Sequence, residues 1–141
     1  MGHSYTFELI NSFEAIPAAT EGLSLWLEAE QVPPAAAYLA TLALEELVTN
    51  CIKYGYDDQA EHLIEVTMSI TESELVMVFT DDGHSFNPLE LPEPDTSLPI
   101  EDRAVGGLGI HMLRKMSDRM EYVYSGGKNR ITLRKSFGAQ I

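Results

Sequence analysis

The chain is poor in cysteine, because Cys51 is the only one among its 141 residues. One thiol cannot form a disulfide within the chain, which fits a reducing compartment. A lone cysteine is more often a small buried residue than a nucleophile, and we interpret Cys51 in this way. The sequence also shows no apolar run of membrane-spanning length and no signal-peptide pattern at its start. These features predict a cytoplasmic protein that does not associate with a membrane.

Positive charge is scarce as well. Nine Lys and Arg residues stand against 22 Asp and Glu residues, which gives a formal net charge of −13. A field of this sign repels phosphate backbones, so direct binding of nucleic acid is not expected. Seven of the nine basic residues lie from Arg114 onward. This basic C-terminal third could meet an acidic protein partner, or it could simply form a solvated face that balances the fold.

The rest of the composition is that of an ordinary soluble globular protein, with 45% apolar and 22% charged residues. A chain of 141 residues is long enough to bury a substantial core. It contains no internal repeat and no linker. We therefore predict a single domain that spans residues 1–141.

Hydrophobic periodicity predicts a strand and two helices in the first part of the chain. Residues 4–10 alternate between apolar and more polar side chains, as a strand with one buried face does. A helix is expected over residues 17–30, with proline at its start. A longer helix, rich in alanine and leucine, is expected over residues 35–54 and ends at Gly55.

The second part of the chain is dominated by expected strands. Residues 63–71 alternate as in a strand with one solvent-exposed face, whereas residues 74–80 are apolar on both faces, as in a central strand. A helix over residues 109–120 and a hairpin of residues 121–125 and 131–135 follow. Together these elements predict an α/β protein, more narrowly an α+β two-layer sandwich. Its mixed sheet has about five strands, and its helices pack on one face.

Residues 87–105, NPLELPEPDTSLPIEDRAV, have no helical or strand periodicity and contain four prolines. A stretch of this length without regular structure inside a compact domain is either disordered or functional. It lies between the end of the expected central strand and a glycine-rich helix start. This position favours a functional segment, a lid that covers a binding site, rather than a disordered one.

Glu46 and Asn50 are four residues apart in LEELVTN, so on a helix they share one face and can point into one cavity. Mg²⁺ prefers oxygen ligands and keeps most of its water, so the amide oxygen of Asn50 beside a triphosphate would suffice. Glu46 could accept a proton from a hydroxyl group or water that attacks the γ-phosphate. The alternative is a solvent-facing glutamate and an ordinary helical asparagine. Glu45 is a rival base, but it lies about a hundred degrees around the helix.

Asp81, Asp82 and Gly83 stand at the end of the expected central strand. A carboxylate at this place can accept a hydrogen bond from the exocyclic amine of adenine. Gly83 would let the base approach the backbone closely, because glycine has no side chain. Asp-Gly is also a frequent turn sequence, so a plain turn is the alternative interpretation.

Three glycines, Gly106, Gly107 and Gly109, open the last expected helix. The free backbone N–H groups at a helix N-terminus bind phosphate through hydrogen bonds and the helix dipole. This pattern is common by chance when it stands alone. Arg103, in the proline-rich segment, is the nearest cation for a terminal phosphate.

Three segments occur in a specific order: LALEELVTNCIKYGY, VFTDDGHSFNP and GGLGIHMLRKMSDRMEYVYSGGKNRITLRK. In this order they resemble the histidine-kinase-like ATPase superfamily (GHKL, Bergerat fold), and within it the bacterial anti-sigma-factor serine/threonine kinases. The resemblance implies that the chain binds ATP with Mg²⁺. It implies Glu46 as the general base, Asn50 as the metal ligand and Asp81 as the adenine contact. Further nucleotide contacts that it implies are Gly83, Arg103, Gly106, Gly107, Leu108, Gly109 and Thr132.

Such proteins phosphorylate a serine or threonine of a small STAS-type antagonist, bind a sigma factor, and commonly form homodimers. The resemblance thus implies a protein serine/threonine kinase that acts as an anti-sigma or similar switch factor. The alternatives are a regulatory module that binds ATP without catalysis, and a bare ATPase. Tyr54 stands where these kinases usually carry histidine, and Ser85 replaces the second glycine of the aspartate-glycine motif. A complete sensor kinase is not expected, since no phosphoacceptor helix precedes the domain.

Overall fold

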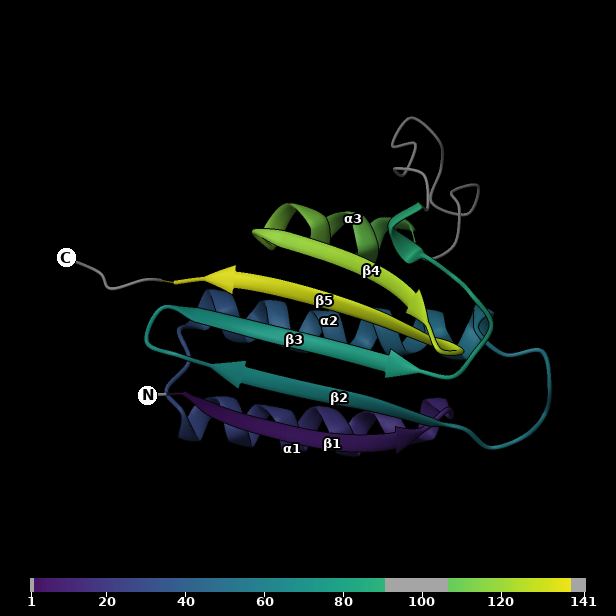
Figure 1. Cartoon of the computed structure of the whole chain (residues 1–141). Coiled ribbons are helices and arrows are strands. Elements are labelled where there is room, and N and C mark those ends of the chain that lie inside the picture. Colours follow the sequence, from purple (N-terminus) through teal and green to yellow (C-terminus); the bar gives the residue numbers. More distant parts are fainter. Residues whose placement is uncertain (1, 91–106, 138–141) are drawn as a thin grey trace.

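The computed structural model describes residues 2–90 and 107–137, which form one open sheet with helices against one face (Figure 1). In chain order its elements are β1 His3–Ile10, α1 Ile16–Ala29, α2 Pro34–Tyr54, β2 Leu63–Ile70, β3 Glu74–Asp81, α3 Gly107–Met116, β4 Arg119–Ser125 and β5 Lys128–Ser136. Two short 3-10 turns occupy Phe13–Ala15 and Pro88–Glu90. The five strands and the helices on one face confirm the predicted two-layer α/β class.

The strand order is β1-β2-β3-β5-β4, and all neighbouring strands are antiparallel, so the expected mixed pairing is corrected. Two connections explain the difference. Both α1 and α2 lie between β1 and β2. A connection of two helices brings β2 back antiparallel to β1, whereas a connection of one helix would make the two strands parallel. Across α3, β3 and β4 do run in the same direction, but β5 inserts between them.

Most expected elements are confirmed to within two residues, and β3 is the central strand. The last helix is an exception, because it ends at Met116 and Met120 belongs to β4. The second hairpin is also tighter than expected. Gly126 and Gly127 have φ angles of 62° and 76°, the left-handed region that a two-residue hairpin turn requires. Asn129 is therefore a residue of β5 rather than of the turn.

The core lies between α2 and the helix-facing side of the sheet. Small alanines on α2 let the helix approach closely, and its leucines fill the space above β2, β3 and β5. The fully buried residues here include Leu39, Ala40, Ala43, Leu44, Val48, Val66, Met68, Met77 and Leu133. By length and composition alone α2 could cross a membrane, which the sequence reading did not anticipate. Half of the most apolar 18-residue stretch of α2 is buried inside the fold, as in the core helix of a soluble protein.

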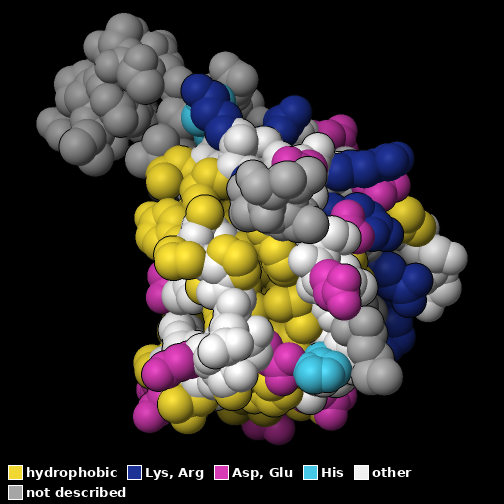
Figure 2. All heavy atoms as spheres, turned by 90° about the vertical axis from the view of Figure 1, so that its left-hand side faces the viewer, with side chains coloured by type: hydrophobic (Ala, Val, Ile, Leu, Met, Phe, Trp, Pro, Cys, Tyr) yellow, Lys and Arg dark blue, Asp and Glu magenta, His cyan; other side chains and the backbone are white. Residues whose placement is uncertain are grey.

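The other face of the sheet is covered by no helix among the described residues (Figure 1). Along each strand, the residues that point to this face alternate with those of the core. Lysine and arginine side chains gather at the upper right of Figure 2, where β4 and β5 lie. The sheet therefore has one buried and one polar side.

Candidate nucleotide site

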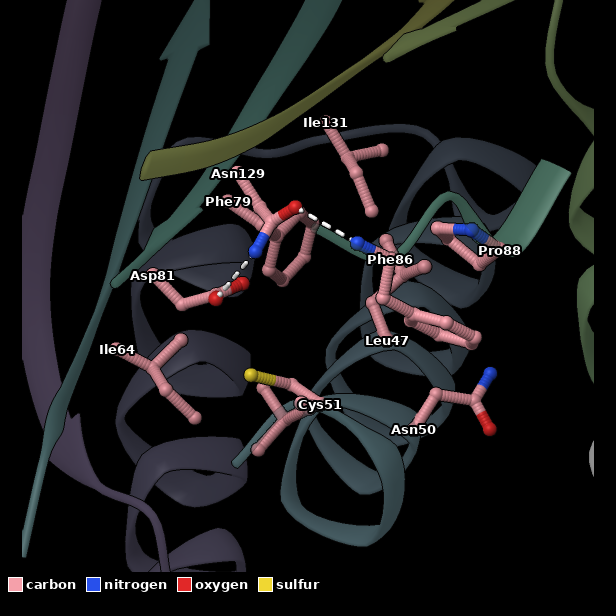
Figure 3. Close-up of a pocket in the computed structure, with 12 residues that line it drawn as sticks. Leu47, Asn50, Cys51, Ile64, Phe79, Asp81, Phe86, Pro88, Asn129 and Ile131 are labelled. Atoms are coloured by element: carbon pink, nitrogen blue, oxygen red, sulfur yellow. Dashed lines mark hydrogen bonds between the residues drawn. The ribbon is translucent and has the colours of Figure 1, made fainter. Parts of the chain in front are cut away.

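A pocket opens at one end of the interface between α2 and the sheet (Figure 3). Its walls come from α2, β2, β3 and β5, and from the segment that follows β3. Most of the lining is apolar, and three polar side chains face it: Asn50, Asp81 and Asn129. An apolar pocket with a few polar groups at fixed places is the usual form of a small-molecule site. Its apolar lining consists of Leu47, Val48, Cys51, Gly55, Ile64, Phe79, Phe86, Pro88 and Ile131.

Asn50 lies on the buried side of α2, and only 2% of it is exposed. Its Nδ2 atom has no hydrogen-bond partner among the described residues. In Figure 3 the amide points away from Asp81, so the two polar groups mark opposite sides of the pocket. A buried polar group without a partner costs about 1–3 kcal/mol, which a ligand in contact with it would relieve. The amide oxygen can take the place of the nitrogen when the group rotates, and it would then present a metal ligand.

Glu46 is half-buried, one helical turn before Asn50, and packs against the start of α3. A Cβ atom on Gly109 would lie 2.1 Å from the Glu46 carboxyl group, so only glycine allows this contact. Burial raises the pKa of Glu46, and the charge of Glu45 adds to the effect, whereas Lys53 opposes it. A raised pKa makes the carboxylate a better proton acceptor near neutral pH. The rival base Glu45 is exposed.

Asp81 is the last residue of β3, and its Oδ1 atom is already held by two donors. The backbone N–H of Gly83 donates to it at 2.9 Å and Nδ2 of Asn129 at 3.0 Å. These bonds fix the carboxylate at the pocket wall as a hydrogen-bond acceptor, the role predicted for an adenine contact.

Gly83 brings the loop after β3 onto the end of α2. A Cβ atom on Gly83 would lie 2.3 Å from the carbonyl oxygen of Gly55. The N–H of His84 donates to that same oxygen at 2.8 Å. Gly83 is therefore needed where the loop packs on the backbone of Gly55, and the predicted approach of the adenine base to Gly83 stays a prediction.

Asn129 is a central polar residue of the pocket that the sequence reading missed. Only 3% of it is exposed, and its Nδ2 also donates to the carbonyl oxygen of His84 at 2.9 Å. Its Oδ1 accepts from the N–H of Phe86 at 3.1 Å and from the hydroxyl of Tyr122. One signal was available, because Asn129 is in phase with the buried residues Ile131 and Leu133. Asparagine is unusual at a buried position of a strand, and its presence there indicates a structural or binding role.

The glycine-rich segment is described only from Gly107, the first residue of α3. Gly107 and Gly109 therefore stand at a helix N-terminus, where phosphate binding was predicted. Arg103 and Gly106, and residues 91–105 of the predicted lid, lie outside the described residues, as does the side chain of Leu108.

Thr132 is not brought to the pocket. It is paired with Val78 on the open face of the sheet, whereas its neighbours Ile131 and Leu133 are buried on the other face. Successive residues of a strand point to opposite faces. The expected contact between Thr132 and the nucleotide is therefore corrected.

Cys51 is buried, as predicted, and its thiol donates to the hydroxyl of Tyr56 at a distance of 3.6 Å. Burial raises the pKa of the Cys51 thiol strongly, and the nearby Asp81 carboxylate raises it further. Because the thiolate is the reactive form, Cys51 is inert as a nucleophile at neutral pH. It serves as part of the apolar pocket wall.

The imidazole of His62 connects the loop before β2 to the loop after β3. Its Nε2 lies 2.8 Å from an oxygen of Asp58, and its Nδ1 lies 3.1 Å from an oxygen of Asp82. The ring also stacks on Tyr56. The hydrogen bond to Asp58 is the main cause that raises the pKa of His62, and the bond to Asp82 adds to it. The same contact lowers the pKa of Asp58.

The His62 bridge predicts that stability depends on pH. Because the folded-state pKa is raised above 6.5, the stabilisation is fully present below that pH and is lost as the pH rises through the raised pKa. The Tm of the wild type should fall between about pH 6 and about pH 8. In His62→Gln this part of the fall should be absent. His84→Gln, at an exposed histidine, is the control, and an unchanged pH profile in His62→Gln would contradict the bridge.

Comparison with known proteins finds one matching domain family and several relatives. The model of the histidine kinase-like ATPase domain family matches residues 11–135. The serine/threonine-protein kinase BtrW of Bordetella bronchiseptica is 24% identical over 96 residues, which cover 68% of this chain and 68% of that protein. The serine-protein kinase RsbW of Halalkalibacterium halodurans is 28% identical over 90 residues, 61% of this chain and 54% of that protein. The anti-sigma F factor of Clostridium beijerinckii is 28% identical over 98 residues, 67% of each chain.

Two solved structures share the fold. The RsbU and RsbW domains of a Mycobacterium tuberculosis protein superpose with a TM-score of 0.63 at 14% identity, covering 98% of this chain and 34% of that one. A chain of the SiaB-SiaC complex from Pseudomonas aeruginosa superposes with a TM-score of 0.57 at 19% identity, covering 94% and 89%. The family model, which spans most of the chain, confirms the resemblance drawn from the motifs. The chain belongs to the histidine kinase-like ATPase domain family.

Proposed function

We propose that this chain is an ATP-dependent serine/threonine protein kinase that acts as an anti-sigma or similar switch factor. The observation that carries the proposal is the arrangement on α2. There the buried amide of Asn50, whose Nδ2 atom has no hydrogen-bond partner among the described residues, lines the pocket, and the Glu46 carboxyl group lies one turn away against Gly109. Relatives named as serine kinases and as an anti-sigma factor support it. The matches span 54% to 68% of those three proteins, so their whole activity is carried over here only as a proposal.

The residues of the pocket fit ATP with Mg²⁺. Asn50 would hold the metal through its amide oxygen, since a neutral oxygen ligand does not repel the triphosphate. Bound Mg²⁺ would neutralise part of the charge that develops on the phosphates. Asp81 would accept a hydrogen bond from the base, with its orientation fixed by Gly83 and Asn129.

Glu46 would remove the proton of the attacking serine or threonine hydroxyl group. Its half-buried position raises its pKa, which brings its proton affinity closer to what a general base needs at neutral pH. The backbone N–H groups at Gly107 and Gly109 would bind phosphate oxygens at the N-terminus of α3. The phosphate acceptor would be a STAS-type antagonist protein, and the regulated partner a sigma factor in the cytoplasm.

Nucleotide binding is tested by thermal unfolding with and without Mg-ATP. At a ligand concentration of about 100 times Kd, wild-type protein should gain roughly 2.7 kcal/mol, or several degrees in Tm. The shift should require Mg²⁺ and should be largely lost in Asn50→Ala. The Tm of unliganded Asn50→Ala is the control for an intact fold. A full Mg-dependent shift in Asn50→Ala would remove Asn50 from the metal site.

Kinase activity is tested separately, by incubating the chain with Mg-ATP and a STAS-type antagonist and locating new phosphate by mass spectrometry. Phosphate on a serine or threonine of the antagonist is the expected result. ATP turnover without any phosphorylated protein would instead support the bare ATPase.

A second candidate is a regulatory module in which ATP sets partner affinity without phosphotransfer. Its structural support is Tyr54, which stands at the usual histidine position and packs its ring on Phe86, with ring centroids 5.7 Å apart. This contact joins the end of α2 to the segment that leads towards the predicted lid. An equal partner Kd with and without Mg-ATP would count against this candidate.

A further inference from the structure

A groove with a volume of about 300 Å³ runs between the end of α1 and the start of α2. The buried side chains of Leu27 and Val32 belong to its lining, so the hydrophobic core reaches the surface here. None of its residues lines the nucleotide pocket, and Tyr38 lies about 18 Å along α2 from Asn50. The lining consists of Ser24, Leu27, Glu28, Val32, Ala37, Tyr38 and Thr41.

Two large apolar side chains at this groove are unusually exposed. Among the large hydrophobic side chains that the structure describes, Leu25 at 63% and Tyr38 at 56% are the most exposed. Tyr38 belongs to the lining, and Leu25 lies one helical turn before Glu28 on α1. Figure 2 shows hydrophobic side chains gathered on its left, the helix side of the molecule. An exposed apolar patch that is bordered by polar residues is typical of an interaction surface.

The charged side chains around the groove are negative. Glu28 belongs to its lining, and Glu21 lies one turn before Leu25 on the same side of α1. Both glutamates are exposed, and neither forms an ion pair within residues 2–90 and 107–137. No lysine or arginine precedes Lys53 in the chain, so α1 and most of α2 offer these glutamates no cation.

This charge decides which kind of partner fits the groove. Carboxylates repel nucleic acid and the surface of anionic lipids. A second copy of the chain at the same groove would place Glu21 and Glu28 of the two copies against each other. A segment with an apolar face and positively charged flanks would instead cover Leu25 and Tyr38 and also meet the glutamates.

We propose that the groove between α1 and α2 binds a basic, amphipathic helix of a partner protein. Apolar side chains of that helix fill the groove between Leu25 and Tyr38. Its lysines or arginines pair with Glu21 and Glu28. Two packed helices present ridges that a third helix can follow, and the 14 residues of α1 span about 21 Å, the length of a partner helix of about four turns. The inference does not depend on nucleotide binding or on phosphotransfer.

Fluorescence anisotropy with a labelled peptide tests the groove. The probe is a peptide of about 18 leucine and lysine residues, with leucine at every third or fourth position so that one helical face is apolar. A Kd of about 1–100 µM is expected for the wild type, as for other small contacts. A peptide of the same composition in scrambled order keeps the charge but loses the apolar face, and it should bind at least about tenfold more weakly.

Leu25→Glu and Tyr38→Glu separate groove binding from a general attraction between a basic peptide and an acidic chain. Each variant adds a negative charge, so attraction by charge alone would strengthen binding. A carboxylate against the leucine face should instead weaken binding by at least about tenfold. Leu63→Glu on β2 and Tyr124→Glu on β4 are the matched controls, since these side chains are also exposed but lie on the sheet. Neither control should weaken binding.

The role of the glutamates is tested with the groove variant Glu21→Gln/Glu28→Gln and the sheet variant Glu8→Gln/Glu65→Gln as its control. All four side chains are exposed, and each double variant removes two negative charges. Only the groove variant should weaken binding at low salt, by about three- to tenfold. The inference is overturned if the wild type does not bind the peptide, if the scrambled peptide binds as tightly, or if the groove variants bind as tightly as the wild type. A loss of equal size in the controls would also overturn it.

Discussion

Replacing Glu46 with glutamine should lower the rate of phosphotransfer by about 10²- to 10⁴-fold, the usual contribution of a general base. Glutamine keeps the size and the packing against Gly109 but cannot accept the proton of the attacking hydroxyl group. The Kd for Mg-ATP should stay close to the wild-type value, because Glu46 is not among the residues that line the pocket. Single-turnover phosphotransfer to the STAS-type antagonist, together with calorimetric titration of Mg-ATP, measures the two quantities.

The same substitution should stabilise the protein at neutral pH. The pKa of Glu46 is raised above 4.5 in the folded state, so its contribution to stability is greatest below that pH and falls as the pH rises through the raised value. Glutamine removes the half-buried negative charge. The Tm of Glu46→Gln should therefore exceed that of the wild type near pH 7 and approach it at about pH 4. Gain of stability with loss of activity is common where a catalytic group is strained or desolvated.

Glu45→Gln is the matched control, because it makes the same chemical change at the exposed neighbouring position. It should leave phosphotransfer nearly unchanged. Gly109→Ala offers an independent approach, since its new Cβ atom would displace the Glu46 carboxyl group without removing it. This variant should also lose activity. Full phosphotransfer by Glu46→Gln would show that Glu46 is not the base.

The sequence predicted well those features that depend on neighbours along the chain. The apolar residues on both faces of β3 indicated a central strand, and β3 lies in the middle of the sheet. The four-residue spacing of Glu46 and Asn50 placed them on one side of α2, where Asn50 lines the pocket and Glu46 packs against Gly109 without lining it. Periodicity is a local property, so it survives in any tertiary arrangement of the same helix or strand.

Features that depend on the pairing of strands far apart in the chain could not be predicted from local periodicity. The pairing of β5 with β3 places β5 antiparallel between β3 and β4, and the paired residues lie 48 to 62 positions apart in the chain. The same pairing brings Asn129 beside Asp81 and turns Thr132 away from the pocket. A short Gly-Gly turn also shifted the start of β5 forward, so that Asn129 entered the core side of a strand.

Asn129→Ala should lower both stability and ATP affinity, because one amide satisfies several groups around the pocket. Its loss leaves the carbonyl oxygen of His84 without this partner, leaves the N–H of Phe86 with only the Tyr122 hydroxyl as acceptor, and removes one of two donors to Asp81. Each buried polar group left unpaired costs about 1–3 kcal/mol. We expect a loss of about 2–4 kcal/mol, or roughly 10 °C in Tm for a domain of this size. The Kd for ATP should rise by at least about tenfold, because Asp81 is no longer held in place.

Tyr122→Phe separates the two effects. It removes the hydroxyl that donates to Asn129 but leaves the amide and its bonds to Asp81 and His84 in place. It should therefore cost less than about 1.5 kcal/mol and leave the Kd for ATP within a few-fold of the wild type. Calorimetry at low temperature, where both variants remain folded, gives the affinities, and thermal unfolding gives the stabilities. An Asn129→Ala variant that is less stable but binds ATP as tightly as the wild type would show that Asp81 keeps its orientation without Asn129. Asn129 would then stabilise the loop alone, and Gly83 would suffice to orient the carboxylate.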